Sequence, residues 1–147
     1  MKIVIASDHG GYALKEDIKS SSLLLSKDIE FIDLGTDNGK ISVDYPDYAA
    51  KLSNYVLTNS IKGVLVCGTG IGMSIAANKI KGIRAALCHD EHTAQMAARH
   101  NNANIIVLGG RILNFKVAEN IVLSWLESNF EKGRHLNRID KITKLEK

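Results

Sequence analysis

The chain of 147 residues has little proline, cysteine or aromatic content: one proline, two cysteines, and 5% phenylalanine, tryptophan and tyrosine. A single proline excludes a proline-rich linker. Two cysteines argue for reduced thiols and against a disulfide framework. No apolar run approaches the roughly 20 residues that cross a bilayer, so we expect no membrane segment. The start, Met1–Ala6, lacks the apolar region and cleavage site of a signal peptide, which favours a cytoplasmic protein.

Charge is also modest, with a formal net charge of +3. Basic residues gather near the C-terminus, but aromatics are few and no nucleic-acid-binding signature is present. We therefore expect a small anionic ligand as the partner, and no nucleic acid. The length and a hydrophobic content of 45% are typical of one globular domain, which we place over residues 1–147.

Strand-like runs alternate with helical patterns along the whole chain. The expected strands are Lys2–Ser7, Glu30–Leu34, Gly63–Cys67, Ile83–His89 and Ile105–Leu108. The expected helices are Tyr12–Leu25, Pro46–Asn59, Ile71–Lys79, Glu91–His100 and Asn114–Phe130. This alternation predicts an α/β fold with three layers, α/β/α, around a five-stranded parallel sheet.

Two helices have apolar faces that can be assigned from spacing. In the first, Leu14, Ile18 and Leu25 share the buried face, while Lys15 and its charged neighbours are expected in solvent. A terminal amphipathic helix, Arg134–Lys147, has apolar residues at every third position with charges between them. Such a helix must dock on its own domain or on a partner subunit, and we expect a partner.

The turn after the third strand, Gly68-Thr69-Gly70-Ile71-Gly72, directly follows Cys67. A strand, a glycine turn and a helix direct free backbone N–H groups at an anion. The same place makes the thiolate of a cysteine available as a base or nucleophile. The alternative is an ordinary turn beside a small buried cysteine. A dinucleotide site is disfavoured, because the third glycine falls one residue early and the turn does not follow the first strand.

Ligands of parallel sheets bind beyond the carboxyl ends of the strands. Polar or glycine-rich segments follow four of the expected strands there, at Asp8–His9, Cys67–Gly72, His89–Asp90 and Gly109–Arg111. The histidines show no metal-ligand spacing, since His89-x-x-His92 is more typical of a polar helix start, so we expect no metal. Arginines favour a phosphorylated ligand, and the candidates are Arg111, Arg134 and Arg138.

Taken together, seven segments resemble the type B ribose-5-phosphate isomerases, the family that also contains the galactose-6-phosphate isomerase subunits. The segments are Ser7–Gly11, Asp44–Pro46, Cys67–Lys79, Gly82–Ala85, Arg99–Asn101, Gly109–Arg111 and Gly133–Arg138. The resemblance implies a Rossmann-like fold and the interconversion of ribose 5-phosphate and ribulose 5-phosphate without metal or cofactor. It also implies a homodimer or homotetramer whose sites are shared between subunits. Cys67 is present and Met73 replaces a glutamate found in another branch, so the chain is similar to the thiolate branch.

The resemblance also implies roles for individual residues. Cys67 would move a proton between C2 and C1 through a cis-enediolate, and Thr69 would pass one between the sugar oxygens. His100, helped by Asp8, would open the sugar ring. The implied substrate-binding residues are Asp8, His9, Tyr45, Gly68, Thr69, Gly70, Ile71, Gly72, Asn101, Arg111, Arg134 and Arg138, with His135 a weaker candidate for the phosphate. For these roles the Cys67 sulfur must face the opening where His100 and the arginines converge.

Two alternatives stay open. The substrate could be a six-carbon sugar phosphate such as allose or galactose 6-phosphate, because pocket length depends on Tyr45 and on residues Thr36–Asp44. The chain could also be a non-catalytic sugar-phosphate sensor, which would need the arginines but not the acid, the base and the glycine turn.

Overall fold

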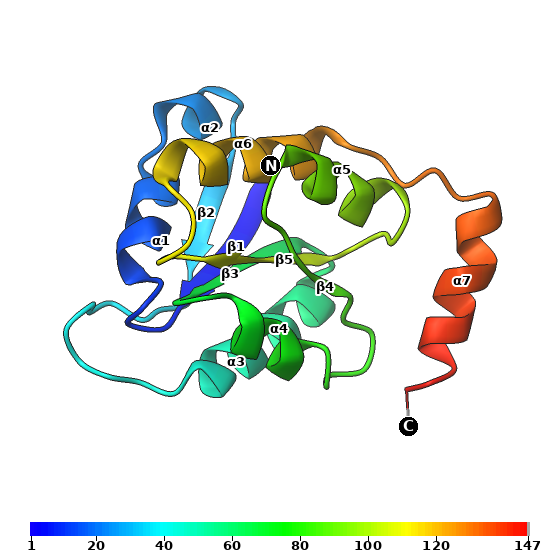
Figure 1. Cartoon of the computed structure of the whole chain (residues 1–147), viewed down its shortest axis with the longest axis horizontal. Coiled ribbons are helices and arrows are strands. Elements are labelled where there is room, and N and C mark those ends of the chain that lie inside the picture. The colour runs from blue at the N-terminus through cyan, green and yellow to red at the C-terminus, as the bar shows by residue number, and fades with distance from the viewer. Residues whose placement is uncertain (147) are drawn as a thin grey trace.

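A computed structural model describes residues 1–146 and places five parallel strands in one sheet, in the order β2-β1-β3-β5-β4 (Figure 1). The strands are β1 (Lys2–Ser7), β2 (Glu30–Asp33), β3 (Lys62–Cys67), β4 (Ala85–Leu87) and β5 (Ile105–Gly109). The helices are α1 (Tyr12–Lys19), α2 (Ser22–Ser26), α3 (Tyr45–Asn59), α4 (Ile71–Ala77), α5 (Glu91–Arg99), α6 (Phe115–Glu127) and α7 (Arg134–Thr143). The predicted three-layer α/β fold is confirmed. Within residues 1–146, no helix is both long and apolar enough to span a bilayer.

The two faces of the sheet hold separate hydrophobic cores. In β3, Val64 and Val66 pack toward α1, α2, α5 and α6, whereas Leu65 and Cys67 pack toward α3 and α4. A central parallel strand is buried on both faces, which explains why its sequence is apolar throughout. The alternation of side chains places the Cys67 thiol on the α3/α4 face of the sheet.

The direction in which the chain adds strands to the sheet reverses between β1 and β3. These strands are neighbours, but the chain continues from β1 to β2 on one side and from β3 toward β5 and β4 on the other. The turns after β1 and β3, residues 8–11 and 68–70, therefore flank a topological switch point. Ligands of open α/β sheets bind at such a point.

The first predicted helix is broken into α1 and α2. The Ser20 hydroxyl donates to the Glu16 carbonyl at 3.0 Å, and the Ser21 hydroxyl accepts the Leu24 N–H at 3.1 Å. Serine side chains compete in this way with the helical backbone, so the second serine opens a new helix. The break turns Leu24 inward and leaves Leu25 49% exposed. The prediction that Leu25 is buried was wrong.

Lys15 is buried, although its charge predicts a position in solvent. Its side chain is fully buried, with Nζ 2.5 Å from Oδ2 of Asp33 and 3.0 Å from Oε1 of Glu16. Asp33 ends β2 beside α1 and supplies the carboxylate that a buried ammonium needs. Burial favours a higher pKa for Asp33, but hydrogen bonds from Lys15 and Lys19 hold that pKa below its ordinary value.

Of the other elements, β4, α6 and α7 differ most from their predicted bounds. β4 covers only Ala85–Leu87, because side chains take over the backbone groups at both of its ends. The Asn78 amide bonds both backbone groups of Ala85, and the Thr93 hydroxyl accepts the N–H of His89. α6 ends at Glu127 and α7 at Thr143; Lys147, the predicted end of the last helix, lies outside the described residues.

Candidate active site

Cys67 is the last residue of β3, and its thiol is held by the glycine turn that follows. The N–H of Gly70 donates to Cys67 Sγ at 3.1 Å, a contact that stabilises negative charge on the sulfur. Gly70 has φ +81°, and a Cβ there would lie 2.5 Å from Leu87 Cδ1. Only glycine combines this left-handed backbone with so little space, so the turn and its hydrogen bond to sulfur depend on it.

Two of the five amides in the turn already have partners inside it. Besides the Gly70 N–H on sulfur, the Ile71 N–H donates to Thr69 Oγ1 at 3.3 Å. The first backbone bond of α4 runs from Ser74 N–H to the Gly70 carbonyl, so the Gly72 amide precedes the helical ladder. The amides of Gly68, Thr69 and Gly72 are therefore the donors that an anion could use here.

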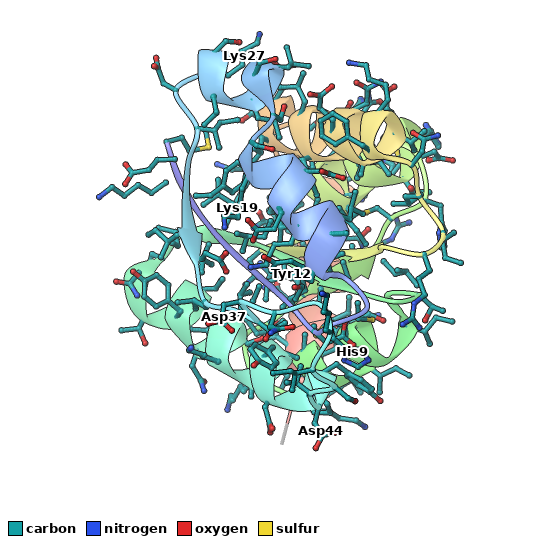
Figure 2. The ribbon with its side chains drawn as sticks, turned by 90° about the vertical axis from the view of Figure 1, so that its left-hand side faces the viewer. His9, Tyr12, Lys19, Lys27, Asp37 and Asp44 are labelled. Carbon is teal, nitrogen blue, oxygen red and sulfur yellow. The ribbon has the colours of Figure 1, made fainter. Side chains whose placement is uncertain are left out.

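The turn after β1 brings two predicted residues, Asp8 and His9, to the same edge. Asp8 is buried, and its Oδ1 accepts the Gly11 N–H at 3.0 Å. His9 accepts the Val43 N–H on Nδ1 at 3.2 Å, which leaves Nε2 to carry the ring proton in the neutral form. Figure 2 views the molecule from this side, with His9 labelled near Asp44.

Arg111, which follows β5, lies over the two neighbouring turns. A Cβ added at Gly10 would be 3.3 Å from its Nη2, and one at Gly68 would be 3.2 Å from its Nη1. The guanidinium therefore lies across the first and third strand ends, beside the residue that follows His9 and the residue that follows Cys67. This placement suits a phosphate or another anion, because the planar fork can donate two parallel hydrogen bonds.

Tyr45 begins α3 and closes the opposite side of the turn. A Cβ at Gly72 would come within 2.5 Å of Tyr45 Cζ, so the ring lies directly on that glycine. α3 and α4 share the face of the sheet on which the Cys67 side chain lies. The structure thus gathers Asp8, His9, Tyr45, the glycine turn and Arg111 around the Cys67 end of β3.

The segment after β4 has a structural role. Asp90 caps α5 by accepting the Thr93 N–H at 2.7 Å, and Thr93 bonds back to the Asp90 N–H, which completes a capping box. This confirms the interpretation of His89-x-x-His92 as a polar helix start. Cys88 is a packed residue: burial and the nearby charge of Asp90 raise the pKa of its thiol to about 12.

The remaining predicted residues do not join this group within one chain. His100 ends α5 just before β5 begins, whereas Cys67 stands at the far end of the parallel neighbour β3. The two side chains therefore lie at opposite edges of the sheet. Arg134 and Arg138 belong to α7, which lies on the side of the molecule opposite to the strand ends (Figure 1). The expected convergence of sulfur, imidazole and all three arginines does not occur in the single chain.

At the second edge, His100 forms a cluster that sequence reasoning missed. Its ring stacks on His135 with centroids 4.2 Å apart, and Oε2 of Glu131 lies 3.7 Å from His100 Nε2 and 3.6 Å from His135 Nε2. Burial, with the positive charges of His100, Arg134 and Arg138, lowers the pKa of His135. The i, i+4 spacing of Glu131 and His135 was the available signal, but no spacing predicts that α7 returns to His100.

The same edge carries a cavity of about 650 Å³ between the end of α7 and the segment from α4 to β4. Residues that line it include Asn78, Arg84, Asn101, Ile142, Leu145 and Glu146. The Gly82 N–H donates to Glu146 Oε1 at 2.9 Å and ties the chain end to the body. Asn101, a predicted sugar contact, thus lies with His100 and α7 and away from Cys67.

The comparisons with known proteins agree with this architecture. The Ribose/Galactose Isomerase family model matches residues 3–142. A Thermotoga maritima ribose 5-phosphate isomerase structure is 51% identical, with a TM-score of 0.92 and 97% of each chain covered. The Mycoplasma genitalium ribose-5-phosphate isomerase B, solved with bound ribulose-5-phosphate, is 44% identical, with a TM-score of 0.91 and coverage of 99% of this chain and 95% of that one.

A third relative, the ribose-5-phosphate isomerase B of Escherichia coli, is 40% identical over 146 residues, which are 99% of this chain and 96% of the relative. The family match extends over most of the chain and includes both edges of the sheet described above. The chain therefore belongs to the Ribose/Galactose Isomerase family and is an isomerase of the ribose-5-phosphate isomerase B type.

Proposed function

We propose that the chain interconverts D-ribose 5-phosphate and D-ribulose 5-phosphate, with Cys67 as the base. The observation that carries this proposal is the Cys67 sulfur, which accepts an N–H from its own glycine turn at the switch point of the sheet. The ribulose-5-phosphate bound to the Mycoplasma genitalium relative supports the choice of a five-carbon substrate.

The proposed reaction moves one hydrogen between adjacent carbons. The Cys67 thiolate takes the proton from C2 of the open-chain aldose, and the freed electron pair forms the C1–C2 double bond of a cis-enediolate. Negative charge then rests on oxygen, where the amides of Gly68, Thr69 and Gly72 can stabilise it. Thr69, which is exposed above the turn, passes a proton between the two oxygens. The thiol returns its proton to C1, and the ketose results.

The phosphate end of the substrate is assigned to His9 and Arg111. The Nε2 of His9 is free to donate because its Nδ1 is occupied by the Val43 N–H. The Arg111 guanidinium lies beside the turn that holds the sulfur. Asp8 and Tyr45 flank the same space, and we assign them to the sugar hydroxyls and the anomeric end. All of these residues lie at one edge of the sheet.

Ring opening needs His100, and we infer that it comes from a second copy of the chain. Within one chain the sheet separates His100 from Cys67, so the acid and the base can meet only across subunits. Helix α7 supports such an assembly, because Leu136 and Ile142 on it are 46% and 42% exposed. Docking α7 on a partner would bury these side chains and bring Arg134, Arg138 and Asn101 with His100 to the partner's sulfur.

A coupled assay of ribose 5-phosphate turnover tests the proposal. Cys67→Ala is expected to abolish turnover while the protein still binds sugar phosphate, and Cys88→Ala, the matched control, is expected to keep it. Turnover at the normal rate in Cys67→Ala would rule out the thiolate as base. Relative kcat/KM on pentose and hexose phosphates checks the substrate: a preference for allose or galactose 6-phosphate would replace the five-carbon assignment. Bound sugar phosphate without any proton exchange at C2 would instead indicate a sensor.

A further inference from the structure

Three side chains that can ligate a metal meet where α7 returns to the end of α5. The Nε2 atoms of His100 and His135 lie 3.7 Å and 3.6 Å from Oε2 of Glu131. The three ligand atoms all lie within 4.8 Å of one another. A tetrahedral zinc ion with bonds of about 2.0–2.1 Å holds its ligand atoms about 3.4 Å apart. The cluster thus has nearly the spacing of a metal site.

The surroundings hold two of these ligands in place. Arg99 binds only Oε1 of Glu131, through Nε at 2.6 Å and Nη2 at 2.5 Å, so Oε2 is left facing the histidines. The Glu131 N–H also donates to the Arg99 carbonyl at 2.9 Å, which fixes the backbone of this connection. The His135 side chain is buried, with 6% of it exposed. Outer partners that orient a ligand in this way are typical of built metal sites.

His100, the third ligand, is the one through which an ion from solvent can reach the cluster. The His100 side chain is 34% exposed, and its ring lies 14° from the plane of His135. Parallel rings direct their nitrogens side by side, so the freer His100 ring must turn for both nitrogens to face one ion. Because this ring is at the surface, it can turn without repacking the core.

We propose that His100, Glu131 and His135 bind a divalent transition-metal ion of the zinc class, with water as the fourth ligand. Two imidazoles and one carboxylate suit Zn²⁺, Co²⁺ or Ni²⁺, whereas Mg²⁺ and Ca²⁺ require a shell of oxygen ligands. The bound ion occupies Nε2 of His100. If the proposed function holds, it thereby removes the group that opens the sugar ring, and the metal acts as a reversible inhibitor.

Cobalt absorption tests the site without reference to activity. Adding Co²⁺ to the metal-free full-length protein is expected to give the visible bands of a four-coordinate ion at one equivalent per chain. Glu131→Gln and His135→Asn are each expected to weaken binding by more than the about 10- to 100-fold that loss of an outer-shell partner causes. His92→Asn, a histidine outside the cluster, is the matched control and should bind normally.

Cys67 is the competing ligand, since thiolates bind the same ions. If Cys67→Ser abolishes the cobalt spectrum while His135→Asn retains it, the metal is on the thiol and the proposal is wrong. A spectrum unchanged in both Glu131→Gln and His135→Asn also overturns it.

Inhibition is measured separately from binding. Zn²⁺ is expected to reduce ribose 5-phosphate turnover of the wild type, with recovery on adding chelator, and to affect Glu131→Gln far less relative to its own metal-free rate. Cobalt binding without inhibition would keep the site but remove its regulatory consequence. Absence of turnover with any sugar phosphate would contradict the proposed function and leave the spectroscopic result unaffected.

Discussion

The ring of Tyr45 rests on the backbone of Gly72, so closely that a methyl group at Gly72 would come within 2.7 Å of the phenol oxygen. The first helix on one face of the sheet is thereby tied to the turn that holds the sulfur. This contact sets how much room a sugar has beside Cys67, because the aromatic ring cannot approach further and has no space to tilt toward α4.

Gly72→Ala therefore tests the position of Tyr45. Alanine favours a helix over glycine by about 1 kcal/mol, so the fold should tolerate the change. The added methyl must displace the Tyr45 ring, and we expect kcat/KM to fall on the order of tenfold, about the loss of one hydrogen bond. Tyr45→Phe is the matched control, since it keeps the ring and removes only the hydroxyl. Unchanged kinetics in Gly72→Ala would exclude Tyr45 from the sugar site.

The two cysteines should differ in reactivity. Burial and the charge of Asp90 raise the pKa of Cys88 to about 12, so its reactive thiolate is scarce at neutral pH. Cys67 is also buried, with 4% of it exposed, but its sulfur accepts the Gly70 N–H in the glycine turn. We expect iodoacetamide to modify Cys67 and to abolish turnover, while Cys88 reacts only after unfolding, as peptide mass spectrometry would measure. Modification of Cys88 first would contradict this assignment.

Lys15 should matter for stability more than its neighbour Lys19. Lys15→Met removes the buried ammonium and leaves Asp33 with Lys19 as its remaining cation. We expect a loss of about 2 kcal/mol in the free energy of unfolding, the size of a hydrogen bond between charged groups. Lys19 contacts the same carboxylate but is 27% exposed. Lys19→Met should therefore cost less than about 1 kcal/mol. Urea denaturation of both variants gives the comparison, and equal losses would show that burial of Lys15 is not the cause.

The ion pairs of Lys15 and Lys19 also predict that stability depends on pH. Burial acts to raise the pKa of Asp33 and of Glu16, but hydrogen bonds from the lysines hold both below their ordinary values of 3.8 and 4.5. The folded state then binds fewer protons than the unfolded chain, so this stabilisation is present above about pH 4.5 and is lost as the pH falls. As the pH falls below this value, the melting temperature of Lys15→Met should decrease less steeply than that of the wild type. An identical slope would contradict the role of Lys15.

The fold could be predicted because each strand and helix has its own local pattern. The alternation of residues such as Val64 and Leu65 on a strand buried on both faces, and the turns that end each element, are properties of short segments. The burial of Lys15 could not be predicted, because its partner Asp33 lies on another element. Ser20 and Ser21 did contain the signal for the helix break. The Ser20 hydroxyl could bond a carbonyl at the end of one helix, and the Ser21 hydroxyl could accept an N–H at the start of the next.

Only the part of the candidate site that follows the strands could be predicted from the sequence. Residues that follow strands gather at one edge by the rule for parallel sheets, and Cys67, His9 and Arg111 obey it. His100 precedes its strand, which places it at the other edge in any parallel sheet. The order of elements therefore implied that one chain cannot join His100 to Cys67, whereas the stacking of His135 on His100 depends on the path of α7 and needed the structure.

Mixing two inactive variants shows whether one site uses the sulfur of one chain and the imidazole of another. Co-expressed Cys67→Ala and His100→Asn chains should form mixed oligomers in which one site keeps both native residues. Turnover should then return to about a quarter of the wild-type value for random pairing in a dimer. Mixed oligomers, verified by native mass spectrometry, that stay as inactive as their parents would contradict the shared site.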